Sequence, residues 1–218
     1  MTASRRLGLN TSATRAALIE AATQVIQEEG YAALTSRRIA EKAGLKPQLV
    51  HYYFRTMDDL VAAIVRVSGD EILKRVARVA ASDEPIRALW KLASDLKAVL
   101  FTMEVAAMAN HHEAIRAETV RYAEQFRSLA AAAVAPYLEQ RGVAPGLAPV
   151  AVTLMMTAIG GLVAREKILG MQVGHREMEA LMENWLHALA DGSQSIPHSK
   201  SGPRLMQKPE PRRRAQRA

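Results

Sequence analysis

Apolar positions along most of this chain recur every three or four residues, as they do on one face of an α-helix. The pattern predicts a helix over residues 12–29, two short helices over 36–43 and 47–53, and a long helix over 57–81. Ser12 or Thr14 can cap the first of these. The sequence contains no convincing run of alternating apolar and polar residues that would indicate a strand. We therefore expect an all-α fold.

The second half of the chain continues the helical pattern and brings the expected number of helices to about nine. The predicted segments are 85–101, 103–109, 114–137 (ending near Pro136), 147–169 and 177–190. The segment 147–169 is apolar on nearly every side, so it requires burial on more than one side. Prolines and glycines interrupt the most apolar stretch, 143–164, and we interpret it as a buried helix. No membrane partner is expected.

Residues 35–60 contain the most informative local pattern, two short helices around a tight turn. Thr35 or Ser36 can cap the first helix with a side-chain oxygen, and Gly44 stands where a helix end favours left-handed backbone. Pro47 has the fixed φ that suits the first turn of the next helix. That second helix buries Val50 and leaves polar side chains outside, an arrangement that fits the major groove of DNA.

The outer residues of these two helices divide into candidates for phosphate contacts and candidates for base contacts. Hydroxyl, backbone N–H and guanidinium groups at the start of the first helix suit phosphates, and they belong to Thr35, Ser36 and Arg37. Lysine suits the O6 and N7 atoms of guanine, glutamine suits adenine, and apolar groups contact thymine methyl groups. The candidates for base contacts are Lys46, Pro47, Gln48, Leu49 and His51.

The spacing of residues from about 13 to 60 resembles the signature of the tetracycline-repressor (TetR) family. The matching residues are Glu29-Gly30-Tyr31, Leu34-Thr35, Ile39-Ala40, Ala43-Gly44-Leu45, Val50, Tyr52, Phe54 and Asp58-Asp59-Leu60. Two residues depart from it: His51 stands where the family usually has Tyr, and Met57 where it often has a Lys that contacts phosphate. The resemblance implies that Tyr52 and Tyr53 contact the DNA backbone.

This resemblance also implies how the chain is divided into domains. Residues 12–56 are expected to form a three-helix helix-turn-helix DNA-binding domain, and residues 57–190 a larger helical domain for effector binding and dimerisation. Ser, Gln, Pro, Gly and Arg dominate residues 191–218, and we expect a disordered basic tail there.

Large apolar residues of the middle helices are the candidates for an effector pocket, which the family resemblance places within residues 57 to about 165. Ten methionines against three phenylalanines indicate an adaptable interior. The candidate lining residues are Trp90, Phe101, Met103, Met108, Tyr122, Phe126, Met155 and Met156. The alternative is that these side chains simply form the core.

The last two predicted helices are the candidates for a homodimer interface. The first is too apolar to be covered by its own subunit, and it carries small residues that permit close approach. Reading two half-sites of a palindromic operator also requires two copies. The candidate interface residues are Ala151, Ala158, Gly161, Leu181, Trp185 and Leu189.

Charge and cysteine content add less than the pattern does. The net charge is +7, but residues 61–190 are neutral and residues 191–218 carry +5, so the high isoelectric point mostly reflects the tail. Arg5, Arg6 and Arg15 form either a basic arm that contacts DNA or an ordinary solvated terminus. The absence of cysteine and of a secretory pattern fits a bacterial cytoplasm.

Enzymatic and metal sites are not indicated. His111, His112 and Glu113 are adjacent in sequence, whereas a metal-binding helix face needs ligands four residues apart. We expect no metal, no cofactor and no catalytic residue. The leading interpretation is a ligand-responsive DNA-binding regulator, a repressor released from a palindromic operator by a small apolar or amphipathic effector. A helical small-molecule enzyme or carrier and an architectural DNA-binding protein are the alternatives.

Overall fold

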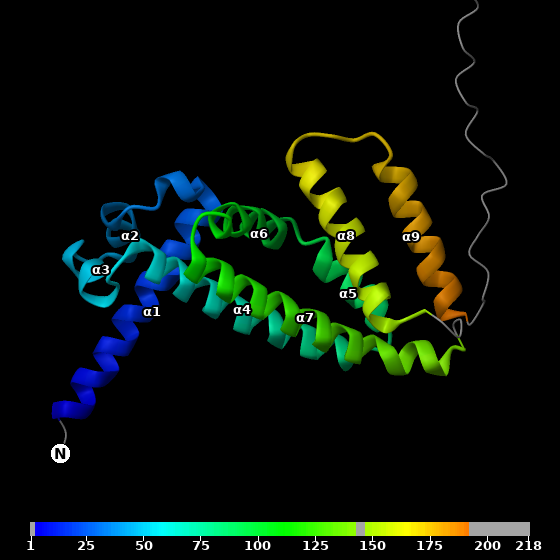
Figure 1. Ribbon diagram of the computed structural model, residues 1–218, viewed down its shortest axis with the longest axis horizontal. Coiled ribbons are helices and arrows are strands. Elements are labelled where there is room, and N and C mark those ends of the chain that lie inside the picture. The colour runs from blue at the N-terminus through cyan, green and yellow to red at the C-terminus, as the bar shows by residue number, and fades with distance from the viewer. Residues whose placement is uncertain (1–2, 143–146, 192–218) are drawn as a thin grey trace, which may run out of the picture.

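The computed structural model describes residues 3–142 and 147–191, and this part of the chain is all-α, as predicted. It contains nine α-helices, one short 3-10 helix and no strand (Figure 1). The elements are α1 (Ala3–Glu29), η1 (Tyr31–Ala33), α2 (Ser36–Ala43), α3 (Gln48–Tyr53), α4 (Met57–Ala80), α5 (Pro85–Ala93), α6 (Leu96–Ala109), α7 (Glu113–Gln140), α8 (Pro149–Ile168) and α9 (His175–Ala190). All of the predicted basic tail beyond Asp191 lies outside the described residues.

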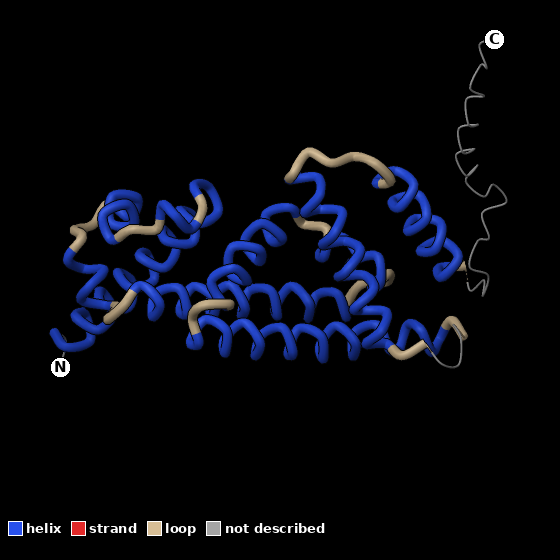
Figure 2. Tube along the Cα trace, turned by 45° about the horizontal axis from the view of Figure 1, so that its top comes forward, coloured by secondary structure: helices blue, strands red, loops and turns tan. Residues whose placement is uncertain are grey.

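Two long helices, α4 and α7, lie side by side and connect the two ends of the molecule (Figures 1 and 2). Helices α1 to α3 gather around the first half of α4, while α5, α8 and α9 lie at the other end (Figure 1). Helix α4 therefore contributes to both ends of the molecule.

Each end of the molecule has its own group of buried side chains. We call them the reading-end core, at the end with the predicted DNA-contacting helices, and the far-end core. The reading-end core combines α1 to α3 with the first half of α4 and with residues of α6 and α7, among them Val105, Met108 and Ile115. The far-end core combines the last turns of α4 with α5, α7, α8 and α9 around Leu89, Val134 and Met156. The reading-end core thus crosses the predicted domain boundary at residues 56 and 57.

Helix α1 begins earlier than its apolar pattern indicated. It starts at Ala3, so Ser12 and Thr14 lie within the helix and the prediction that either residue caps it is wrong. The apolar stripe begins only at Ala17 and Leu18, and Leu18 is the first residue of α1 that is buried among those whose burial is described. The first turns of α1 have no apolar stripe in the sequence, so the periodicity could not reveal that the helix begins there.

The segment between α5 and α6 was also predicted wrongly. The expected single helix over 85–101 breaks at Ser94 and Asp95, and α6 then runs without interruption to Ala109. The Asp95 carboxylate accepts hydrogen bonds from the backbone N–H groups of Lys97 (3.1 Å) and Ala98 (3.3 Å), so it caps α6. Apolar residues keep their helical spacing through the break, which hid this capping residue.

Helix α7 continues through Pro136 to Gln140 rather than ending near the proline. Val134 and Leu138, on either side of Pro136, are both buried in the far-end core. Packing of these side chains offsets the backbone hydrogen bond that a proline inside a helix removes. This extension places the last turns of α7 against α8.

Gly69 of α4 lies directly against the Tyr122 ring of α7. A Cβ atom at this position would lie 2.3 Å from Cδ1 of Tyr122, so only a residue without a side chain leaves room for the ring. The Tyr122 hydroxyl donates a hydrogen bond to Asp70 (2.7 Å). Burial of the phenol is the larger cause that raises its pKa, and this hydrogen bond is the second cause. Gly69 therefore permits close packing, and α4 is continuous through it.

Candidate nucleic-acid interface

Local hydrogen bonds define the helix-turn-helix as the sequence predicted. Thr35 Oγ1 accepts a hydrogen bond from the N–H of Arg38 (3.2 Å) and so caps α2. Gly44 ends α2 with left-handed backbone (φ 65°), and Pro47, with a φ of −56°, directly precedes α3. Ile39 is fully buried. The turn between the two helices is thus fixed by cap, glycine and proline together.

The short helix α3 presents a polar face to solvent. Val50 points into the reading-end core, and Phe54 follows it there at the end of the helix. On the opposite side Gln48 and His51 are exposed, and Tyr52 is 74 % exposed. Side chains that offer hydrogen bonds from a helix six residues long suit the edges of bases in a major groove.

The other predicted contact residues occupy two different environments. Leu49 and Tyr53 are half-buried and pack against the reading-end core, and the Tyr53 ring meets that of Tyr52 edge-on. Ser36 is half-buried at the start of α2. The exposed predicted residues are Thr35, Arg37, Lys46, Pro47, Gln48, His51 and Tyr52.

Ion pairs separate structural cations from those on the outer surface. The Arg38 guanidinium donates to both carboxylate oxygens of Glu29 (2.8 Å each) and lowers the pKa of that carboxyl. Lys42 pairs with Glu28 at 2.6 Å. These contacts fasten α2 to the end of α1. Arg37 and Lys46, by contrast, have no ion-pair partner in the described part of the chain, so their charges are available to phosphates or bases.

Two further cations lie next to α3: Arg55, which was not predicted, and Arg15, a candidate of the predicted basic arm. Arg55 is exposed in the turn after α3, and within the described ranges it makes no ion pair. Arg15 lies over the Phe54 ring, with its guanidinium carbon 5.1 Å from the ring centre. Arg55 was not among the predicted contacts, although a basic residue directly after the second helix could have indicated it.

Helices α1 to α3, which we call the reading unit, are attached to the rest of the molecule at several points. The ring nitrogen Nδ1 of His112, just before α7, lies 2.8 Å from Oδ2 of Asp58, in the first turn of α4. The backbone N–H of Tyr31 donates to Glu104 of α6 (3.4 Å). Together with the shared reading-end core, these contacts connect α6 and α7 directly to the helices that would meet DNA.

Six of the eight predicted effector-pocket residues are divided between the two cores. Phe101, Met108 and Tyr122 belong to the reading-end core, whereas Trp90, Phe126 and Met156 belong to the far-end core. The remaining two lie apart from these groups: Met103 is half-buried on α6 and Met155 is exposed on α8.

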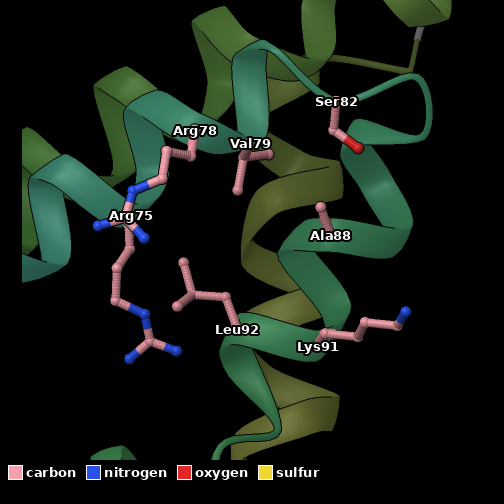
Figure 3. Close-up of a pocket in the computed structure, with 7 residues that line it drawn as sticks. All are labelled: Arg75, Arg78, Val79, Ser82, Ala88, Lys91 and Leu92. Carbon is pink, nitrogen blue, oxygen red and sulfur yellow. The ribbon is translucent and has the colours of Figure 1, made fainter.

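Two hollows occur in the larger helical part of the described structure. One, of about 410 Å³, lies between the α5–α6 junction and the α8–α9 pair, and its lining includes Trp90, Ser94 and Val163 together with Glu179 and Glu183. The Ser94 hydroxyl oxygen is buried and has no hydrogen-bond partner among the described residues. The other, of about 350 Å³, lies between α4 and α5 and is lined by Arg75, Arg78, Val79, Ser82, Ala88, Lys91 and Leu92 (Figure 3).

The predicted interface residues on α8 and α9 differ in exposure. Ala151, Ala158 and Leu181 are exposed, Gly161 and Trp185 are half-buried, and Leu189 is buried within its own subunit. Leu154, Met155 and Leu162 extend the exposed apolar surface of α8. By length and composition alone α8 would be long enough to cross a membrane, but such a feature is also typical of a helix in a soluble protein.

The family model for bacterial regulatory proteins of the tetR family matches residues 18–64. The transcriptional regulator BetI of Rhizobium meliloti is 30 % identical over 199 residues, which cover 84 % of this chain and 93 % of BetI. A regulator of Saccharomonospora viridis solved with choline aligns with a TM-score of 0.69 and 16 % identity, over 81 % of this chain and 96 % of that one. FadR of Bacillus subtilis, solved with stearoyl-CoA, aligns with a TM-score of 0.59 and 17 % identity, over 81 % and 97 %.

The matched segment begins inside α1 and ends inside α4, so it contains the capped turn, the exposed face of α3 and the core beneath them. The relative extends the similarity over most of the remaining helices. This chain therefore belongs to the tetR family of bacterial regulatory proteins, and it is a DNA-binding regulator of transcription rather than an enzyme.

Proposed function

We propose that this protein is a cytoplasmic, effector-controlled repressor that binds a palindromic operator as a homodimer. The observation that carries the proposal is the exposed polar face of α3, where Gln48, His51 and Tyr52 stand outward on a helix anchored by Val50. Gln48 and Lys46 are the proposed base contacts, and Arg37 holds phosphate from the start of α2.

The homodimer is proposed from the outer face of α8. Leu154, Ala158 and Leu162 recur every four residues there, and all three are exposed in the single chain. A continuous apolar stripe of this kind marks an interaction surface, and a two-fold axis would pair it with the same stripe of a second copy. Helix α9 adds Leu181 and Trp185, whereas Leu189 packs inside its own subunit.

Effector control is proposed from the continuity between the reading-end core and helices α6 and α7. An effector that binds better to a form in which the two reading helices no longer match adjacent grooves lowers operator occupancy. The two solved neighbours carry choline and stearoyl-CoA, so this fold accepts ligands of very different size. Here the 410 Å³ hollow beside Trp90 is the candidate site, because the Ser94 hydroxyl meets no described protein group that satisfies it.

Selection of bound sequences from a random DNA library tests the DNA part of this proposal. We expect an enriched inverted repeat with half-site centres about 34–36 Å apart, bound by two copies of the chain. Enrichment of a single half-site, or of no sequence at all, would contradict it. A chain ending at Asp191 should select the same repeat; loss of all binding would favour an architectural protein that acts through its basic tail.

Fluorescence of Trp90 tests the effector site. The chain has two tryptophans, so a Trp185→Phe variant leaves Trp90 as the single reporter. A ligand that releases operator DNA should change Trp90 emission, and Ser94→Leu, which fills the hollow, should abolish both responses. A releasing ligand whose effect survives Ser94→Leu binds elsewhere.

A further inference from the structure

The 350 Å³ hollow between α4 and α5 has a chemistry that DNA reading does not explain. Arg75 and Arg78 come from the last turns of α4, and Lys91 comes from α5 (Figure 3). Between them Val79 and Leu92 form an apolar floor. Cations around an apolar surface are complementary to an amphipathic anion.

The positive charge of this hollow is only partly neutralised by the protein. Arg75 donates to Asp95 Oδ2 (2.9 Å), a carboxylate that also caps α6. Arg78 and Lys91 have no ion-pair partner among the residues that the structure describes. In the turn that follows α4, Glu84 pairs with Arg87. Three lining cations therefore face one carboxylate, and an excess of positive charge remains.

Ser82 lines the same hollow from the turn after α4, and its oxygen accepts a hydrogen bond from the N–H of Glu84 (3.3 Å). Figure 3 places Ser82 and Ala88 on the α5 side of the hollow, across from the two guanidinium groups, with the Ser82 oxygen directed away from them. The small Ala88 side chain leaves the space open. An anion in the hollow would thus meet guanidinium donors on the α4 side and open space beside Ala88.

We propose that this hollow binds a small organic anion with a compact apolar body, of the aryl or short-chain carboxylate class. The carboxylate accepts hydrogen bonds from Arg78 and Arg75, and the apolar body lies on Val79 and Leu92. Lys91 adds positive charge at the rim on the α5 side, and its side chain points away from the two guanidinium groups (Figure 3). This site goes beyond the proposed effector hollow at Trp90, because the two hollows share helix α5 but no lining residue, and they differ in charge.

The place of the site gives its occupation a structural consequence. Helix α4 is 24 residues long and carries the DNA-reading helices α1 to α3 at its first turn and this hollow at its last turns, a separation of about 30 Å along a helix axis. A ligand that bridges α4 and α5 holds the far end of α4 against the far-end core. Occupation therefore favours one orientation of the helix that supports the DNA reader.

Calorimetric titration of the full chain with benzoate tests the proposal. We expect saturable binding of one benzoate per chain, with binding of neutral benzamide and of acetate at least about tenfold weaker. Arg78→Gln should weaken benzoate binding about tenfold, because it removes a charge-assisted hydrogen bond. Lys91→Gln should have a smaller effect, and Ala88→Phe, which fills the hollow and keeps all three cations, should abolish binding.

Lys74→Gln is the matched control, since Lys74 is an exposed cation on the same helix that pairs with Glu71 and does not line the hollow. Equal losses in Lys74→Gln and Arg78→Gln would show non-specific attraction and overturn the site. Binding of acetate or inorganic phosphate as tight as that of benzoate would contradict the proposed contact of an apolar ligand body with Val79 and Leu92. Benzoate binding that responds to Ser94→Leu but not to Arg78→Gln would place the anion in the other hollow. The two charge-neutralising variants, Arg78→Gln and Lys91→Gln, change surface side chains, so they test the site even if Ala88→Phe fails to fold.

Discussion

Helices α3 and α8 both leave one face uncovered in the single chain, but the two faces have opposite chemistry. On α3 the outer side chains are amide, imidazole and phenol, and the helix is held by one buried valine and its neighbours. On α8 the outer side chains are Leu154, Met155 and Leu162, on a helix of 20 residues. Exposure alone is common in proteins. The polarity of the exposed face is the reason we propose DNA as the partner of one helix and a second subunit as the partner of the other.

The two ends also differ in how their supporting contacts are arranged. Around α2 and α3 the contacts are local, with caps and ion pairs between residues a few positions apart, such as Thr35 with Arg38 and Glu29 with Arg38. Around α8 they come from helices far apart in sequence, including α5 and α7. The turn between α2 and α3 is thus fixed mainly by residues close to it in sequence, whereas the position of α8 depends on helices far from it in sequence.

Breaking the apolar face of α8 should have the largest effect. Ala158→Glu places a charge at the centre of the proposed seam, and we expect a monomer whose operator affinity is lower by about 10²-fold or more, because linked half-sites gain at least that factor. Sedimentation and gel-shift titration measure the two effects. Ala117→Glu, at an exposed alanine of α7, is the matched control and should remain dimeric. An Ala158→Glu dimer of full strength rules out the interface.

Changes at the contact between Gly69 of α4 and Tyr122 of α7 should have the next largest effect. Gly69→Ala drives a methyl group into the Tyr122 ring, and overpacking of this kind lowers the free energy of unfolding by about 1–3 kcal/mol. Gly161→Ala, in a helix position with open space around the new Cβ, should instead raise it by up to about 1 kcal/mol. Urea unfolding of both changes in the monomeric Ala158→Glu background measures them without dimer dissociation. Equal effects would contradict the packing role of Gly69.

The polar face of α3 is tested by separating base contacts from phosphate contacts. Gln48→Ala should cost about 1–3 kcal/mol at one operator position and relax the preference there. Arg37→Ala should weaken binding to all sequences alike. It should also reduce the slope of log affinity against log salt concentration by about 1, as expected for one lost phosphate contact. Titrations against single-base operator variants at several salt concentrations distinguish them. An unchanged preference profile in Gln48→Ala removes that residue from the base contacts.

The smallest effect concerns Asp95, at the break that separates α5 from α6. Partial burial acts to raise its pKa, but hydrogen bonds from Arg75 and from the N–H of Ala98 outweigh burial, and the pKa lies below its usual value. Its ionised form therefore stabilises the fold at neutral pH, and this contribution is lost as the pH falls below about 4 and through the lowered value.

Asp95→Ala should lower the free energy of unfolding at neutral pH by about 0.5–2 kcal/mol through loss of the cap. Asp95→Asn keeps a capping oxygen but no charge, so its stability should depend less on acid than that of the parent chain. Denaturant unfolding from pH 3 to 7 makes the comparison. An Asn variant with the parent's full acid dependence shows that another group carries it.

The helix-turn-helix was readable from sequence because its determinants are local. A capping Thr35, a left-handed Gly44 and the buried Val50 lie within sixteen residues, and each fixes the backbone near itself. The break at Ser94 and Asp95 was missed because the apolar spacing continues through it and hides the Asp95 cap. The passage of α7 through Pro136 was missed because packing against other helices decides it. Arg37, which has no ion-pair partner in the described ranges, and the paired Arg38 likewise look alike in sequence, and only the position of Glu29 separates them.

By itself, then, the sequence determined the all-α class, the reading helix and its outward residues, because helical periodicity and turn chemistry act over a few residues. The tertiary structure decided which large side chains share a cavity. It divided the predicted pocket residues between two cores, left the Ser94 hydroxyl without a partner among the described residues, and brought Arg75, Arg78 and Lys91 around one hollow. Such groupings arise from how α4, α5, α7 and α8 cross, and crossing depends on the shapes of many side chains at once, which no short segment specifies.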